Sequence, residues 1–127
     1  MTHAVHHRDP VDEAALEALD LFIMNTSELY PQRRAIQENM SRRIENGSYD
    51  PLKAPKLFLY LIDNGAKAYS REFGAASDHV FSPATREALA QRMAHREYAE
   101  LMLQQRQARS AVRGYGRGRG YGDPGVR

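Results

Sequence analysis

The C-terminal end of the chain carries the residue types best suited to binding a polyanion. From Gly114 to Gly122 every second residue is glycine, and the residues between are arginine or tyrosine. Arginine supplies positive charge, several hydrogen-bond donors and a planar group that stacks, and tyrosine supplies an aromatic face; both suit phosphates and unpaired bases. The sequence predicts a contact with RNA or single-stranded DNA at six positions: Arg109, Arg113, Tyr115, Arg117, Arg119 and Tyr121.

The same composition allows two other interpretations. An arginine-rich peptide can fold onto an acidic protein partner, and a tail of this kind can also keep a protein soluble without binding any partner. Only two uninterrupted Arg-Gly repeats occur, between Gly116 and Gly120. Nucleic acid is the favoured partner, and its binding is expected to be weak and sensitive to salt.

The chain is expected to divide into a folded body and a basic tail. The tail has almost no apolar side chains to bury, and glycine loses the most backbone entropy on folding. We predict a flexible N-terminus at residues 1–9, one helical domain at residues 10–105 and a disordered basic tail at residues 106–127. From Gln105 on there are six arginines and one aspartate, whereas residues 1–104 hold twelve basic and fifteen acidic residues. The predicted body is therefore mildly acidic.

Four helices are expected from capping residues and from apolar residues at helical spacing. Their approximate ranges are 10–29, 31–46, 51–73 and 83–105. Asp9, Asp50 and Ser82 are the predicted N-caps of the first, third and fourth helices, since each precedes a proline at the first helical position. The predicted fold class is all-α: a compact bundle of about four helices with a disordered Arg/Gly/Tyr-rich C-terminal tail.

The third helix is the most strongly predicted and is expected to be central. Its apolar stripe consists of Phe58, Ile62, Tyr69 and Phe73. Pro55 would make the first turn irregular, because its ring clashes with the carbonyl four residues earlier. Gly65 in the middle is costly for a helix, and a close helix crossing would explain it.

Two helices also carry basic residues that could form a second binding surface. The third helix has a polar, partly basic face, and the second has four arginines. The polar face of the third helix consists of Lys56, Tyr60, Asn64, Lys67 and Arg71. The arginines of the second helix are Arg33, Arg34, Arg42 and Arg43. An ordinary solvated surface is the favoured interpretation, and a basic patch requires the two faces to align.

Residue patterns typical of enzymes are missing from the sequence. It has no Walker A loop and no nucleophile elbow, and the G-x-G-x-x-G at Gly120–Gly125 lacks the following helix that a dinucleotide site needs. His3, His6 and His7 lie at a terminus without a structured ligand beside them. We expect no enzymatic activity, no catalytic residue, no cofactor, no metal site and no small-molecule substrate.

Composition also bears on location. The chain has no cysteine, which excludes disulfides and thiolate metal sites. Its longest apolar run, Leu57–Ile62, is far shorter than a membrane span, and the N-terminus lacks the apolar stretch of a signal peptide. A cytoplasmic protein without a membrane partner is expected.

Part of the body resembles a known group of proteins. The similarity spans about residues 16–100 and rests on three motifs: Glu28-Leu29-Tyr30, Gly47-Ser48-Tyr49-Asp50-Pro51, and the aromatic and acidic positions from Lys56 to Phe73. These motifs resemble small uncharacterised helical proteins of bacteriophages and other mobile elements. The resemblance implies a compact α-helical fold and a phage context, and it transfers no activity and no site residue.

Two functions follow as expectations. The first is a non-enzymatic, nucleic-acid-associated accessory protein whose tail gives weak, sequence-independent binding to RNA or single-stranded DNA. The alternative is a protein-interaction module, for instance a phage-encoded regulator, inhibitor or structural subunit, that binds a protein partner through its helical surface.

Overall fold

The computed structural model describes residues 10–74 and 81–121, with the backbone alone for residues 112–121. The described residues form four α-helices and one short 3-10 helix and contain no strand. The elements are α2 (Glu13–Asn25), η1 (Ser27–Leu29), α3 (Tyr30–Glu45), α4 (Lys56–Phe73) and α5 (Pro83–Tyr121). The predicted all-α class with four helices is confirmed. The chain divides into two units, Met1–His95 and Arg96–Arg127.

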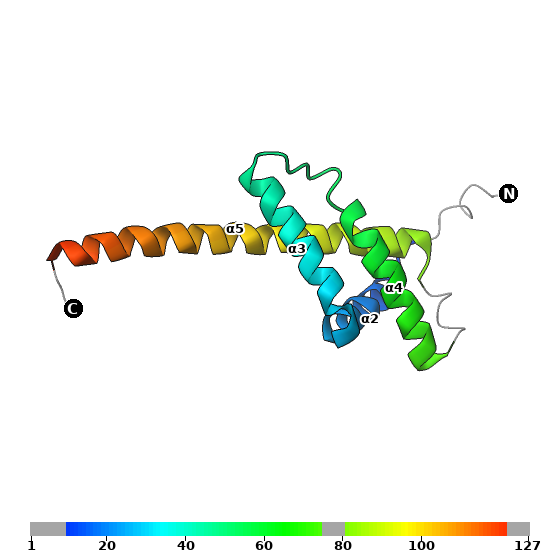
Figure 1. Cartoon of the computed structure of the whole chain (residues 1–127). Helices are drawn as coiled ribbons and strands as arrows, with labels where there is room; N and C mark the ends of the chain where they lie inside the picture. The colour runs from blue at the N-terminus through cyan, green and yellow to red at the C-terminus, as the bar shows by residue number, and fades with distance from the viewer. Residues whose placement is uncertain (1–9, 75–80, 122–127) are drawn as a thin grey trace. The chain divides into compact units, whose positions relative to one another are not determined.

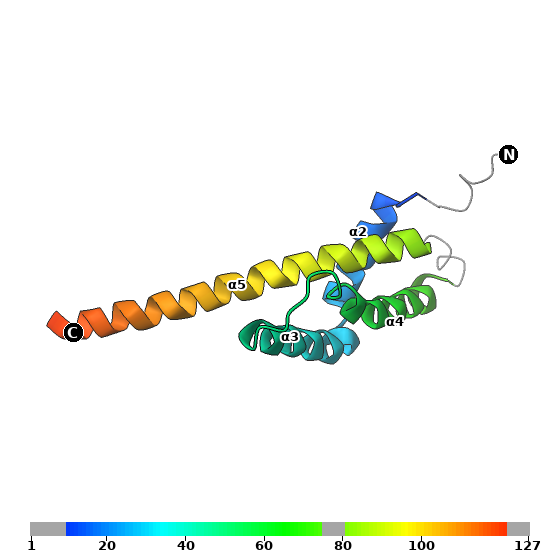
Figure 2. The same ribbon diagram turned by 90° about the horizontal axis from the view of Figure 1, so that it is seen from above.

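The core of the first unit lies where α2 crosses α4 (Figures 1 and 2). Its buried apolar residues from these two helices include Leu16, Leu19, Ile23, Phe58, Leu61, Ile62 and Ala66. At the crossing, a Cβ atom built on Gly65 would lie 2.5 Å from Cγ1 of Ile23. Only glycine lets the two helices approach this closely, so the close crossing predicted from Gly65 is confirmed.

The start of α5 completes this core. Leu89 is fully buried, as is Thr85, whose hydroxyl oxygen accepts a hydrogen bond from the backbone N–H of Asp12 at 3.1 Å. Ser82 is the N-cap that the sequence predicted, since its hydroxyl accepts from the N–H of Thr85 at 3.2 Å. Phe81, one residue before the cap, is buried with its ring edge-on to Tyr69 at 5.0 Å between centroids.

Helices α3 and α4 lie side by side and antiparallel (Figure 1). The Asn64 side-chain amide donates to Oε1 of Gln32 at 3.1 Å and ties the two helices together. Gly47, at φ +79°, ends α3, and the next two N–H groups, of Ser48 and Tyr49, donate back to the carbonyl of Arg43. This turn fixes how the chain leaves α3 and enters the segment before α4.

Two predicted N-caps were wrong. The first helix begins at Glu13 with Asp12 as N-cap, because the Asp12 carboxylate accepts from the N–H of Ala15 and its backbone is held by Thr85. The third begins at Lys56 rather than Pro51. Asp50 caps only an irregular turn through the N–H of Leu52, and the expected disturbance at Pro55 is confirmed.

The predicted apolar stripe of α4 was right except at its end. Phe58 and Ile62 are buried and Tyr69 is half-buried, but Phe73 is 61% exposed. Phe73 is the last residue of α4. Its ring lies against the ring of Tyr69, with 4.6 Å between the centroids, and the rest of the side chain is exposed to solvent.

Helix α5 is longer than the sequence analysis suggested. Its backbone is helical as far as Tyr121, beyond the expected end at Gln105. The segment from Leu101 to Arg113 contains no glycine or proline, so no residue there stops the helix. Residues 122–127, the last part of the predicted disordered tail, lie outside the described residues.

Candidate nucleic-acid interface and a basic pocket

Helix α5 arranges part of the predicted nucleic-acid site as a row. At 3.6 residues per turn, position 113 is rotated by about 40° from position 109, and position 117 by about 40° from position 113. The three positions therefore share one face of the helix. Position 106 falls on the same face, and Arg106 and Arg109 are both exposed. The four arginine positions, which we call the α5 arginine row, span about 16 Å along the helix axis.

The row includes one residue that the sequence prediction missed and leaves out others that it included. Arg106 was missed because a disordered tail has no helical faces, so its spacing from Arg109 carried no meaning there. Positions 115 and 119 lie on other faces of α5 than position 113. Position 121 lies at the margin of the face that carries the row. Among the six predicted residues, Arg109 is the one whose side chain the structure describes, and it is exposed.

The end of α5 is intrinsically a weak helix. Gly114, Gly116, Gly118 and Gly120 all lie in it, and each costs about 1 kcal/mol relative to alanine in a helix interior. The disorder expected for the free tail therefore stays a prediction. The helical backbone is the arrangement in which the arginine positions align.

The last acidic residue of α5 before the row is Glu100, more than one and a half turns before Arg106. From Leu101 to Gly122 the sequence holds five arginines and no acidic residue. A polyanion lying along this stretch of α5 would meet no carboxylate from the same segment, so its attraction to the arginines would be unopposed there.

The basic residues of α3 and α4 do not form one continuous patch. Arg33 and Arg34 both lie over the ring of Tyr30, with each guanidinium carbon 5.9 Å from its centroid. The Arg34 guanidinium donates to the Tyr30 hydroxyl at 3.2 Å, and this contact, followed by that with Glu38, raises the pKa of Arg34 above its ordinary value. At this end of α3 the arginines are engaged locally.

Carboxylates also neutralise basic groups on α4 and α5. Arg71 forms an ion pair with Glu28 at 3.1 Å. Arg86 of α5 forms one with Asp63 at 3.0 Å, and it also donates to the carbonyl of Phe81. These contacts hold the helices together, so the interpretation of an ordinary structural surface fits this region.

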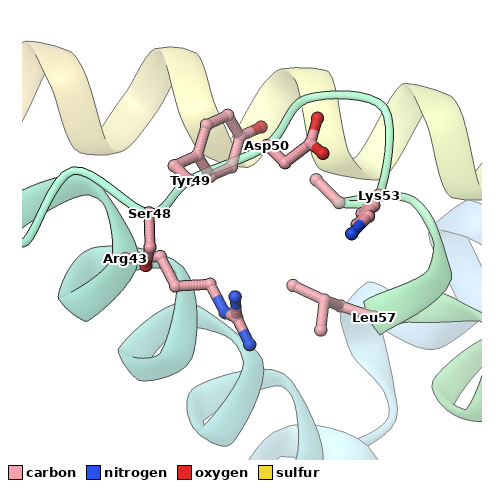
Figure 3. Close-up of a pocket in the computed structure, with 7 residues that line it drawn as sticks. Arg43, Ser48, Tyr49, Asp50, Lys53 and Leu57 are labelled. Atoms are coloured by element: carbon pink, nitrogen blue, oxygen red, sulfur yellow. The ribbon is translucent and has the colours of Figure 1, made fainter.

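One arginine of the α3 face, Arg43, lines a pocket where α3 ends and α4 begins, which we call the basic pocket. Its volume is about 230 Å³, and it is lined by Arg43, Ser48, Tyr49, Asp50, Lys53, Ala54 and Leu57. Figure 3 shows Arg43 reaching into the hollow from α3, with Lys53 and Leu57 facing it from the opposite side. Asp50 also lines the pocket and lies between Tyr49 and Lys53 in the same view.

The other chemical groups singled out from the sequence remain separate. His95 is exposed on α5, whereas His3, His6, His7 and the Asp78-His79 pair lie outside the described residues. Within the described ranges no three His, Cys, Asp or Glu side chains come together as metal ligands. None of the helices described here is both long enough and apolar enough to cross a membrane.

Comparisons with protein-family models, with curated proteins and with solved structures found no match for this chain.

Proposed function

We propose that this chain is a non-enzymatic, nucleic-acid-associated accessory protein of the cytoplasm. The α5 arginine row contacts the phosphates of RNA or single-stranded DNA, and the tyrosines of the tail stack on bases. The observation that carries the proposal is the helical spacing of Arg106, Arg109, Arg113 and Arg117 on a segment without acidic residues.

The expected binding is electrostatic and independent of sequence. Arginines on phosphates release counterions, which gives affinity without reading base identity. Tyr115 and Tyr121 would add stacking, worth about 1–3 kcal/mol per base, which is tolerant of sequence because every base has an aromatic face. The mildly acidic body would not attract the polyanion, so binding is confined to the end of the chain.

A titration with labelled single-stranded RNA and DNA at low salt tests this function. The variant Arg113→Gln/Arg117→Gln/Arg119→Gln should bind clearly more weakly than the unaltered protein. The matched control Arg42→Gln/Lys56→Gln/Lys67→Gln removes the same charge from exposed positions of the body and should bind nearly as well. Equal losses in both variants would show that net charge, not the tail, determines binding.

One observation favours the second candidate, a protein-interaction module. Large apolar side chains are exposed around the start of α4, with Leu52 at 87% and Tyr60 at 72%. Exposed apolar groups close together mark interaction surfaces when they form a contiguous patch. If the unaltered protein binds no nucleic acid at low salt, this function replaces the first, and Leu52→Ser/Tyr60→Ser is the variant that should abolish partner binding.

A further inference from the structure

The basic pocket has features that the proposed nucleic-acid contact does not use. Its two cations come from segments ten positions apart in sequence, and the turn at Gly47 brings them to opposite sides of one hollow (Figure 3). Neither Arg43 nor Lys53 forms an ion pair within residues 10–74 and 81–121. Both side chains are exposed and line the same pocket, so an anion placed between them would be attracted by both charges.

We propose that the basic pocket binds a phosphate monoester group held between Arg43 and Lys53. This site lies in the body of the protein and does not depend on the tail. A phosphate monoester is a class of ligand that the sequence did not predict.

The hydrogen bonds of the pocket leave its cations available. The Nε–H of Arg43 donates to Oδ1 of Asn39 at 2.8 Å, which orients the guanidinium and leaves its terminal amino groups for a ligand. The carboxylate of Asp50 accepts from the N–H of Leu52 at 2.9 Å, so the acidic residue of the pocket is engaged with its own turn. The lining thus offers one oriented guanidinium and one ammonium group, beside a carboxylate that already accepts a hydrogen bond from its own turn.

Charge and size favour a phosphate monoester over a carboxylate or an extended ligand. A phosphate monoester carries nearly two negative charges at neutral pH and three acceptor oxygens, which matches one forked guanidinium and one ammonium. The volume of about 230 Å³ is below the usual 300–1,000 Å³ of sites that enclose a whole drug-sized molecule. Leu57 and Tyr49 offer apolar surface for the group that the phosphate esterifies.

The site can be tested by titrating the ¹⁵N-labelled full chain and following the amide signals of Ser48, Lys53 and Leu57. The probes are sodium phosphate and adenosine 5′-monophosphate, and their controls are sodium chloride at equal ionic strength and adenosine. We expect saturable shifts at these amides with the two phosphates and none with the controls. A short RNA with a 5′-phosphate, compared with the same RNA ending in a 5′-hydroxyl, shows whether a strand terminus is also accepted.

Matched substitutions decide whether these two cations are the ligands. Arg43→Gln and Lys53→Gln should each weaken phosphate binding by about tenfold or more, because each removes a charged hydrogen bond. Arg42→Gln and Lys56→Gln remove the same charges from neighbouring positions outside the pocket lining and should change affinity less than twofold.

Two results would overturn the proposal. One is the lack of saturable shifts at the pocket amides with both phosphate probes, and the other is an equal loss of affinity in all four variants. Neither result touches the proposed tail function. That function is measured separately, as affinity for RNA with a 5′-hydroxyl, which Arg43→Gln should leave nearly unchanged.

Discussion

At the scale of single residues, Gly65 sets how closely α2 and α4 approach. A methyl group there would lie 2.5 Å from Cγ1 and 2.7 Å from Cδ1 of Ile23, which is fully buried. We expect Gly65→Ala to lower the free energy of unfolding by about 1–3 kcal/mol through overpacking, outweighing the gain of about 1 kcal/mol in helix propensity. Urea unfolding measures this.

A second substitution tests whether overpacking against Ile23 causes the loss of stability. Ile23→Val removes Cδ1, so in the double variant the loss should be smaller than the sum of the two single losses. A Gly65→Ala variant that is more stable than the unaltered protein would show that the helices are not in contact at this position.

The role of Gly65 could be predicted from the sequence, whereas that of the two cations of the basic pocket could not. A glycine within a strong helical pattern is locally unfavourable, and this cost already pointed to a helix crossing. Arg43 and Lys53 carry no such signal, because each is an ordinary surface cation until the turn at Gly47 places them around one hollow. The structure was needed to bring them together.

At the scale of elements, α4 has one buried and one exposed face. Phe58→Ala and Ile62→Ala should each cost about 2–5 kcal/mol, because both side chains are buried. Lys67→Ala should cost well under 1 kcal/mol because Lys67 is exposed. Chemical denaturation of the three variants compares them directly, and similar losses at all three positions would contradict this assignment of faces.

If α5 is helical as far as Tyr121, Arg117 and Arg119 should contribute unequally to binding, which a disordered tail does not predict. Arg117 and Arg119 sit in identical Gly-Arg-Gly surroundings, but only position 117 shares a face with 109 and 113. If the tail binds nucleic acid as a helix, Arg117→Gln should weaken binding more than Arg119→Gln. Fluorescence anisotropy with labelled RNA measures both, and equal losses would indicate binding in an extended form.

Helix interiors followed from sequence better than helix ends. Ser82 was found because its hydroxyl caps its own helix, a purely local interaction. The N-cap of the first helix is instead Asp12, whose backbone is held by Thr85, and that partner is distant in sequence. The helical backbone continues past Gln105 because no glycine or proline interrupts residues 101–113.

At the scale of the whole molecule, the body and the end of the chain are predicted to be independent in stability. Among the side chains that the structure describes, all the large, fully buried ones belong to residues before Arg96. Deleting residues 106–127 should therefore shift the melting temperature by less than about 4 °C, which corresponds to less than 1 kcal/mol for a domain of this size. Helical ellipticity will fall because part of α5 is removed, so the melting temperature is the informative readout. A drop of more than about 8 °C would show that the tail stabilises the body.

The central claim is that the end of the chain binds nucleic acid through its arginines, and the salt dependence of the affinity tests it most directly. Each arginine on a phosphate of a single strand contributes about 0.7 to the slope of log K against log salt. The four arginines of the α5 arginine row should thus contribute about −3 to the slope, and replacing all four by glutamine should remove most of the salt dependence. Tyr115→Ala and Tyr121→Ala should weaken binding with little change in slope. No binding at low salt, or a slope that survives the four substitutions, would contradict the account.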